Sequence, residues 1–463
     1  MEEKGTLSPP PGFFKMLGPS IVLLGLGLGS GELVLWPYLV SRFGLGIIWA
    51  AVFGFLAQFF MNMEIERYSL VKGESVFAGF SRFSRAAPWW FLFSTFIAWV
   101  WPGIIGTSAK IFSDAFGIAD YQYLAIAMLV IIGLVLTVSR KLYKTIELWQ
   151  KLIIGIGIPI ILVIALYLVK SSDVHALYLG LAGIGDGYRF FPYGLPLLTF
   201  LGAIAYAGAG GNLNLAQSFY IKEKNYGMCK GTKGISSVLY NQEKPDIFGR
   251  SFEANSANLQ LFSRWWRLTN WEHFIAFFVT GVFTVLLMSL LAFGTLGLSG
   301  AASEGVGFIA LEAEAIKSLL SSGVGLLFLL VVALMLFNTQ FMILDSTSRI
   351  IAENMVILKK ELNLSKTYYF ALWIQILGAI IIFLLGFAQP FTLVIIGAVI
   401  NAVAMFVHLG ATYILNIKAL PEELHPSIPR RVVLAFVWLF FGGFSFYAIY
   451  DGLTKFFGLW IKF

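Results

Sequence analysis

At residues 25–32 the sequence reads GLGLGSGE, a glycine-rich stretch inside an apolar run from about residue 18 to residue 40. A second stretch, AGAGGN at residues 207–212, interrupts another apolar run from about residue 195 to residue 220. Glycine is a poor helix former, and unpaired backbone at membrane depth is tolerated only inside protein or around a cavity. Each interrupted run opens a set of five, so the paired breaks predict the binding site of an inverted-repeat transporter. The alternative is that these glycines only let helices pack closely.

The composition is that of an integral membrane protein. Of the 463 residues, 58% are hydrophobic and only 12% are charged. Repeated apolar runs of about 20 residues match the roughly 30 Å hydrocarbon layer of a membrane. The single cysteine, Cys229, excludes an internal disulfide. No Cys/His cluster in the sequence suggests a structural metal, and the sequence predicts no cofactor and no nucleic-acid partner.

The apolar runs predict an all-α membrane protein with about 11 transmembrane helices, arranged as a five-plus-five inverted repeat with helices 1 and 6 unwound. The whole chain, 1–463, is expected to form one transmembrane transporter domain. Its parts are a first repeat over 18–169, a second repeat over 195–414 and an additional C-terminal helix within 415–463. The predicted spans are 18–40, 46–66, 89–113, 121–139, 148–169, 195–220, 272–296, 322–346, 367–387, 389–414 and 431–457.

Lys and Arg are unevenly distributed between the loops that join these spans. If the amino terminus is inside, the inner segments hold most of them, including those of residues 222–267, and the outer segments hold few. Cytoplasmic loops carry the excess of positive charge. We therefore expect a multi-pass protein with its N-terminus in the cytoplasm and its C-terminus outside, in a bacterial plasma (inner) membrane or, alternatively, a eukaryotic membrane. Residues 171–194 are expected to form an outer loop and residues 223–270 an inner one.

Several motifs resemble the opening of the Nramp (natural-resistance-associated macrophage protein) family. They are GPS at residues 18–20 together with the first glycine stretch, EIERYSL at 64–70 and KGES at 72–75. The third span, with IIGTSA at 104–109, and Glu147 before span five fit the same family. The resemblance covers nearly the whole chain. It implies a secondary transporter that moves a divalent metal ion by alternating access around helices 1 and 6.

The sequence departs from that family at the residues that bind metal. Nramp members have Asp-Pro-Gly-Asn in the first break, so the Asp position is Gly29 here and the Asn position is Glu32. The family's Met-Pro-His sequence in the sixth span falls on Ala209 and the two following glycines, if its Asn is aligned with Asn212. The acidic pair on span three, which the family uses in proton movement, has no acidic counterpart here. The resemblance therefore leaves proton coupling open.

A cation would find oxygen ligands at both breaks. Glu32 supplies a carboxylate at membrane depth, where an ionisable group is by default a functional hypothesis. We predict Glu32 and Asn212 as metal ligands, and the absence of the Met thioether at Ala209 favours a hard Mn²⁺-like or Mg²⁺-like ion over soft metals. Glu32 could instead be a neutral carboxylic acid that only bonds a neighbouring helix. The full set of predicted substrate-binding residues is Gly29, Ser30, Glu32, Tyr206, Ala209, Asn212 and Asn214.

A small organic solute, such as an amino or carboxylic acid, is the alternative cargo. The GSG sequence at residues 29–31 resembles that of amino acid–polyamine–organocation carriers, which share this five-plus-five, leucine-transporter-like architecture. Exposed amides at a helix N-terminus attract carboxylates. A receptor or a scaffold derived from a carrier is a third possibility. An enzyme is not expected, because neither a nucleophile–base pair nor a nucleotide-binding loop is present at useful spacing.

Other polar residues in the later spans could line a transport pathway. The candidates are Gln340, Asn401 and His408, and helix packing is the alternative role for each. Asp345 and Arg349 are four residues apart and are predicted to form an intrahelical ion pair. The expected partners are a small cation or small solute and membrane lipid, and the sequence does not predict an oligomeric state.

Overall fold

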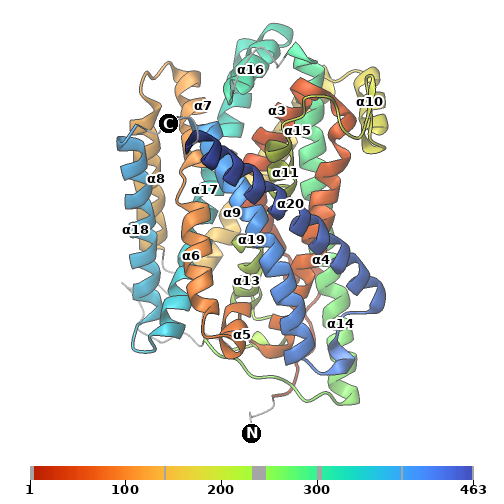
Figure 1. Ribbon diagram of the computed structural model, residues 1–463, viewed down its shortest axis with the longest axis vertical. Coiled ribbons are helices and arrows are strands. Elements are labelled where there is room, and N and C mark those ends of the chain that lie inside the picture. The colour runs from red at the N-terminus through yellow and green to blue at the C-terminus, as the bar shows by residue number, and fades with distance from the viewer. Residues whose placement is uncertain (1–4, 140–141, 232–246, 300–304, 387–388, 461–463) are drawn as a thin grey trace.

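The structure, a computed structural model, describes residues 5–139, 142–231, 247–299, 305–386 and 389–460, the side chains of residues 455–460 excepted. Most helices run along the long axis of the molecule (Figure 1). The first part contains α1 (Phe13–Met16), α2 (Pro19–Gly27), the π-helix η1 (Gly31–Leu35), α3 (Trp36–Phe43), η2 (Leu45–Ile47), α4 (Trp49–Lys72), α5 (Val76–Phe83), α6 (Ala87–Trp99), α7 (Gly103–Phe116), α8 (Tyr121–Val138) and α9 (Leu142–Leu168).

The second part begins with a short helix and a hairpin on one end of the bundle. It contains α10 (Ser171–Leu181), β1 (Ile184–Gly185), β2 (Tyr188–Arg189), α11 (Leu197–Ala205), α12 (Asn212–Leu215), α13 (Gln217–Glu223), η3 (Gly227–Cys229), α14 (Ser256–His273), η4 (Phe274–Val279), α15 (Thr280–Leu296), α16 (Gly307–Leu319), α17 (Ser322–Leu358), α18 (Leu364–Leu384), α19 (Pro390–Ala419), η6 (Glu422–Leu424) and α20 (Ile428–Trp460). In Figure 1 the chain enters the bundle at the lower end, and α20 runs toward the upper end.

Within the described residues, nine helices are long and apolar enough to cross a membrane. A tenth span results if α2 and the η1–α3 helix, which meet at a 41° bend, count as one crossing. The predicted span over 195–220 is divided into the short helices α11, α12 and α13, which do not pass this test of length. The predicted total of about 11 therefore depends on counting that broken segment as a crossing.

Two segments expected to be loops contain regular structure. Residues 171–194 include α10 and a small antiparallel hairpin in which Ile184 pairs with Arg189. An Asp-Gly turn, typical of tight hairpins, joins the two strands, and Gly187 has φ +77°. In the predicted inner loop over 223–270, α14 begins at Ser256 and continues through η4 into α15 as one 41-residue helix. The FSRWWR stretch at 262–267 is therefore part of this long helix.

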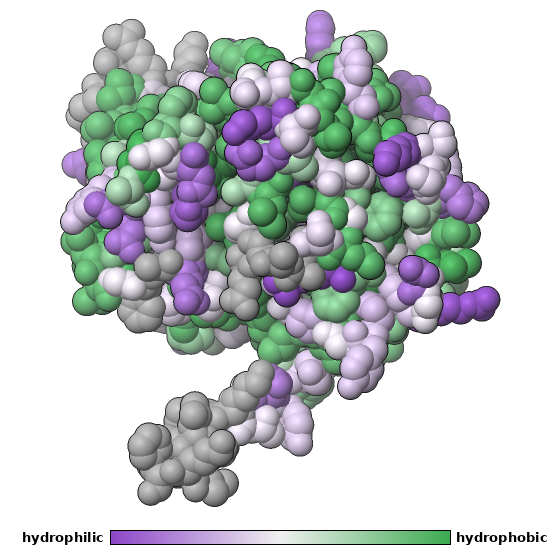
Figure 2. All heavy atoms as spheres, turned by 90° about the horizontal axis from the view of Figure 1, so that it is seen from above, coloured by the Kyte–Doolittle hydropathy of each residue, from purple (hydrophilic) through white to green (hydrophobic). Residues whose placement is uncertain are grey.

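The outward faces of the long helices are apolar. Exposed large side chains lie on α8, α9, α18 and α20, for example Leu134, Leu166, Leu384 and Phe436, which are 52–73% exposed. Seen along the long axis, the upper end of the molecule has hydrophilic side chains between apolar ones (Figure 2). An apolar surface of this extent on a water-soluble monomer would be unusual, and it fits contact with lipid. The chain is thus a multi-pass membrane protein.

Outside the spans, α16 holds a buried acid, and Glu312→Gln is expected to raise the melting temperature at pH 8. Glu312 is fully buried, and neither of its carboxylate oxygens has a hydrogen-bond partner among the residues that the structure describes. Burial raises the pKa of Glu312 to about 8. Between the ordinary pKa of a glutamate and that value, the folded protein keeps a proton that the unfolded chain has lost. Stability therefore falls as the pH rises through this window, by an amount on the order of a few kcal/mol.

Thermal unfolding of the purified protein in detergent from pH 5 to pH 8 measures this effect. The glutamine variant should lose less stability over this range than the wild type. Glu314→Gln is the matched control, because Glu314 lies on the same helix with 69% of its side chain exposed. An identical pH dependence in Glu312→Gln and the wild type would contradict the prediction.

Candidate functional site

The first break follows directly from the sequence around Gly27, where α2 ends. The carbonyl of Leu28, in the break that follows α2, accepts a hydrogen bond from the Thr339 hydroxyl on α17, at 2.8 Å. A Cβ on Gly29 would lie 2.4 Å from the Thr339 methyl group, so this position has no room for a larger side chain. The aspartate that the Nramp family carries there would not fit without a shift of α17.

The second break extends from Tyr206 to Gly211, between α11 and α12. Gly208, Gly210 and Gly211 have φ values of +114°, +73° and +58°, which L side chains rarely adopt. Regular helix hydrogen bonding therefore stops at Ala205, and the peptide groups of the break need other partners.

Gln58 of α4 supplies those partners, and its role was not predicted from the sequence. Its Nε2 donates to the carbonyls of Ala205 and Ala207 at 2.9 and 2.7 Å, and its Oε1 accepts from the amide of Gly210 at 3.0 Å. One side chain thus bonds three backbone groups of the broken segment. The available signal was a lone glutamine in the otherwise apolar run from Trp49 to Met61.

Glu32 joins the two breaks. It lies in the π-helix η1 and is fully buried. Its Oε1 accepts a hydrogen bond from the amide of Gly208 at 2.9 Å, and its Oε2 accepts a weaker one from the amide of Gly29 at 3.4 Å. The breaks also touch directly, because a Cβ on Gly31 would lie 2.0 Å from the carbonyl oxygen of Tyr206. The glycines were interpreted from the sequence either as helix breaks or as sites of close helix packing. The structure shows both, because the helices are interrupted at the glycines and the interrupted segments pack closely against each other.

The two predicted asparagines face different neighbours. Asn214 donates to Gln58 at 2.9 Å and to Asn62 at 2.8 Å, both on α4. Asn212 donates to the hydroxyls of Ser94 and Thr95 on α6 at 2.9 and 2.5 Å. The side chains of Glu32 and Asn212, predicted as a pair of metal ligands, are thus held by separate sets of hydrogen bonds.

Asn401 of α19 lies against the second break from the other side. Its Nδ2 donates to the hydroxyl of Tyr206 at 3.2 Å, and a Cβ on Gly211 would lie 1.9 Å from its Oδ1. The Tyr206 ring stacks on Trp99, with ring centroids 5.7 Å apart. Two of the three predicted pathway residues therefore lie beside the second break, because His408 also lies next to Gly211. Ser30 and Ala209, predicted as substrate-binding residues, are buried as well.

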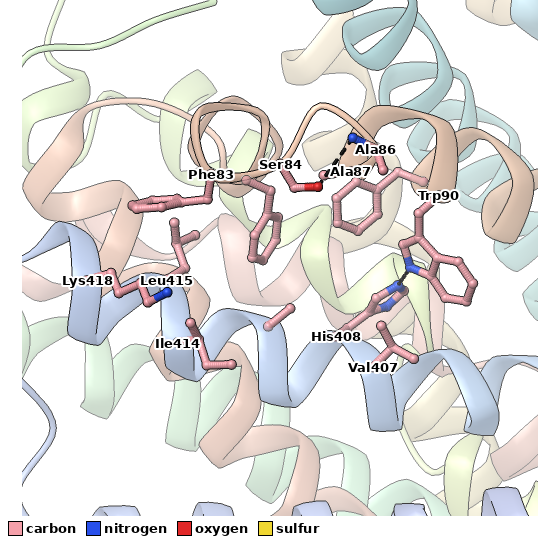
Figure 3. A pocket seen from close by; sticks show the side chains of 13 residues that line it. Phe83, Ser84, Ala86, Ala87, Trp90, Val407, His408, Ile414, Leu415 and Lys418 are labelled. Carbon is pink, nitrogen blue, oxygen red and sulfur yellow. Dashed lines mark hydrogen bonds between the residues drawn. The ribbon is translucent and has the colours of Figure 1, made fainter.

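His408, also on α19, lines a mainly apolar pocket (Figure 3). The pocket has a volume of about 330 Å³ and lies between α5, α6 and α19. The ring accepts a hydrogen bond from the Trp90 indole at 3.1 Å, which Figure 3 shows as a dashed line. Apolar and aromatic side chains form most of the lining, among them Phe80, Phe83, Phe91, Val407 and Ile414. The ring also lies beside Gly211 of the second break. The pathway role of His408 and the alternative packing role both stay predictions.

On α17, Gln340 is buried, and the predicted Asp345–Arg349 ion pair is present with an N–O distance of 2.9 Å. The pair is extended beyond the helix. Arg349 also contacts Glu223 at the end of α13 at 2.8 Å, and Asp345 accepts a hydrogen bond from the Tyr368 hydroxyl at 2.7 Å. The ion pair therefore connects α17 to the segment that follows the second break and to α18.

No family model matches the sequence, and no curated protein matches it significantly. Among solved structures, it is similar to a variant of the manganese transporter of Eremococcus coleocola, with a TM-score of 0.70 and 15% identity over 98% of this chain and 91% of that chain. It is also similar to MhsT in complex with L-phenylalanine, with a TM-score of 0.53 and 13% identity over 94% of this chain and 98% of that one.

A third similar structure is MHP1, a nucleobase-cation-symport-1 family transporter, with a TM-score of 0.50 and 11% identity over 95% of this chain and 92% of that chain. These proteins share one architecture and have different cargoes. The chain has the leucine-transporter-like fold of secondary transporters. The resemblance to metal transporters inferred from the sequence is confirmed at the level of the fold.

Proposed function

We propose that this protein is a secondary transporter of a hard divalent cation, Mn²⁺ or Mg²⁺ in character. The fold supports a transporter, and the choice of a cation rests on the polar groups around the two breaks. The cargo would bind between the η1 segment and the second break and would be released by alternating access. Because Ala209 stands where the related family has a thioether ligand, a soft metal has less to bind.

The observation that carries this proposal is a set of three buried acceptor atoms near the second break. The side-chain oxygens of Asn212, Asn214 and Asn401 are buried and have no hydrogen-bond partner in the described structure. Buried acceptors normally have a partner, so such atoms point to a missing donor or cation. Carbonyl and carboxylate oxygens are the ligands that Mg²⁺ and Mn²⁺ prefer.

The position of Glu32 argues against a carboxylic acid as cargo. In the organic alternative, the amides of a broken helix would bind the carboxylate of the solute. Here Glu32 already accepts hydrogen bonds from the amides of Gly208 and Gly29. An anionic cargo would have to displace this carboxylate or lie beside it, and like charges at close range repel strongly in a site without water. A cation is attracted instead.

A direct uptake assay distinguishes the two cargo classes. We expect purified protein in sealed liposomes to carry Mn²⁺ inward, detected by quenching of trapped calcein, and Mg²⁺ to compete with Mn²⁺ at millimolar concentration. A panel of radiolabelled amino acids should not enter above the rate of protein-free liposomes. Amino acid uptake with no movement of Mn²⁺ or Mg²⁺ would overturn the proposal in favour of the organic alternative.

We also propose the finer layout that the sequence analysis predicted. Residues 18–169 and 195–414 would be the two inverted repeats, and α20 would be the additional helix. The excess of Lys and Arg in alternate loops supports a cytoplasmic N-terminus in a bacterial plasma membrane. Accessibility of cysteines introduced at each end of the bundle would test this, since the natural Cys229 is buried.

A further inference from the structure

Three titratable side chains that the proposed transport site does not use lie together in the bundle. They are Glu66 on α4 and the adjacent Glu272 and His273 on α14, all with at most 1% of their surface exposed. The ligand atoms of the three side chains lie within 4.8 Å of one another. His273 Nδ1 is 3.4 Å from a carboxylate oxygen of Glu66. No local sequence pattern indicates this cluster, because Glu66 is far along the chain from Glu272 and His273.

Hydrogen bonds from two further segments hold the carboxylates in place. The Ser20 hydroxyl at the start of α2 donates to Glu272 and lies 2.8 Å from His273 Nδ1. The amides of Gly18 and Ser20 both donate to Glu272 at 3.3 Å. Gln217 of α13 donates to Glu66 at 2.8 Å. The cluster therefore joins α2, α4, α13 and α14. Of these, α2 ends at the first break, and α13 follows α12 after the second break.

The imidazole is fixed by stacking. His273 lies against Phe277, with ring centroids 4.7 Å apart and planes 9° apart, and against Phe59 at 5.6 Å and 25°. Two parallel contacts of this kind restrict rotation of the ring about its side-chain bonds. His273 Nε2 and one oxygen of Glu66, Oε2, are buried with no hydrogen-bond partner in the described structure. The orientation of the ring is thus restricted by stacking, and two polar atoms of the cluster lack a hydrogen-bond partner among the described residues.

Each carboxylate of the cluster has a cationic group in its surroundings. Arg430 acts on Glu66, and Lys224 acts on Glu272. Both cations are at ion-pair distance from carboxylates outside the cluster, because Arg430 shares Glu64 with Arg67, and Lys224 shares Glu147 with Lys151. Buried carboxylates need a paired charge, a metal ion or a proton. Two carboxylates and an imidazole in one pocket are a donor set for a divalent transition metal.

We propose that Glu66, Glu272 and His273 bind a divalent metal ion of the Mn²⁺ or Zn²⁺ type, at a site separate from the two breaks. Metal–oxygen and metal–nitrogen bonds of about 2.1 Å place neighbouring ligands about 3.0–3.4 Å apart and opposite ligands of an octahedral ion about 4.2 Å apart. His273 Nδ1 and Glu66 already lie 3.4 Å apart, and the other ligand atoms, all within 4.8 Å of one another, would move closer on binding the ion. Ser20 lies eight residues before Leu28, so the site is about 12 Å along α2 from the first break.

This site does not depend on the identity of the cargo. By linking α2 and α13 to α4 and α14, a bound ion would hold together the half-helices on one side of both breaks. Such an ion stabilises the conformation that binds it by mass action. If the cargo is an organic solute, the ion remains a resident structural ion. If the cargo is a metal, the cluster is a second binding site along α2.

Electron spin echo spectroscopy of Mn²⁺ bound to the full-length, untagged protein in detergent tests the proposal. A coordinated imidazole gives a ¹⁴N modulation that carboxylate and amide oxygens do not give. The chain contains 4 His, of which His273 and His408 are fully buried. We expect the modulation in the wild type and in His408→Phe, and its loss in His273→Phe, where a phenyl ring keeps the stacking on Phe59 and Phe277.

Calorimetric titration with Mn²⁺ adds an independent measure. Glu272→Gln should weaken binding at one site at least tenfold and leave binding that depends on Glu32 in place. Absence of ¹⁴N modulation in the Mn²⁺-saturated wild type would overturn the proposal even if the variants fail to fold. Persistence of the modulation in His273→Phe would overturn it as well. Neither result bears on uptake, so failure of this site is distinguishable from failure of the proposed transport function.

Discussion

Glu32→Gln is expected to reduce Mn²⁺ uptake by about 10- to 100-fold in a protein that still folds. The carboxylate accepts hydrogen bonds from the amides of Gly208 and Gly29. A glutamine would direct its own NH₂ group at one of these donors and would remove the negative charge that attracts the cargo. Hydrogen bonds to charged groups contribute about 1.5–3 kcal/mol, which corresponds to the stated loss.

This substitution also tests the alternative role of Glu32. Glutamine is a close mimic of a protonated glutamate, so a permanently neutral acid would tolerate the change. Uptake at the wild-type rate would therefore assign Glu32 to structure and remove it from the mechanism. Glu314→Gln, on the exposed side of α16, is the control for the chemistry of the substitution. Size-exclusion chromatography and the melting temperature in detergent establish that each variant is folded.

The location of the breaks could be predicted from the sequence because glycine acts locally. A run of glycines inside an apolar segment weakens the helix wherever it occurs, and α2 and α11 end at Gly27 and Ala205, within or just before the two runs. The partners of the broken backbone could not be predicted in the same way. Gln58 bonds the second break from α4, and no local pattern indicates which helix will lie beside it.

The candidate site was predicted unevenly for the same reason. Glu32 was evident as an ionisable residue within an apolar span, and the structure places it across both breaks. The helices that the asparagine side chains contact could not be predicted from the sequence. Asn212 and Asn214 are only two residues apart, yet Asn212 contacts α6 and Asn214 contacts α4. A cluster such as Glu66 with His273 exists only after distant helices have packed. Single-residue signals therefore identify candidates, and packing decides which of them meet.

Gly31→Ala is expected to have the second large effect, a loss of uptake together with a fall in stability. The new Cβ would lie 2.0 Å from the carbonyl oxygen and 2.7 Å from the carbonyl carbon of Tyr206. Backbone atoms cannot rotate away as a side chain can, so the first and second breaks would have to separate. Overpacking of this kind typically costs about 1–3 kcal/mol, and more where the backbone cannot relax. The melting temperature of the purified variant measures the fall in stability, and its Mn²⁺ uptake in liposomes measures the loss of transport.

Two further variants separate close packing of the breaks from a general effect of alanine. Gly443→Ala on α20 should be neutral or slightly stabilising, because nothing lies within 4 Å of the added Cβ and alanine is the better helix former by about 1 kcal/mol. Gly29→Ala meets the Thr339 methyl group at 2.4 Å, and Thr339→Ser removes that methyl group while keeping the hydroxyl that bonds Leu28. Partial recovery of uptake in the Gly29→Ala, Thr339→Ser double variant is therefore expected. Wild-type uptake in Gly31→Ala would mean that the two breaks need not touch for the transporter to work.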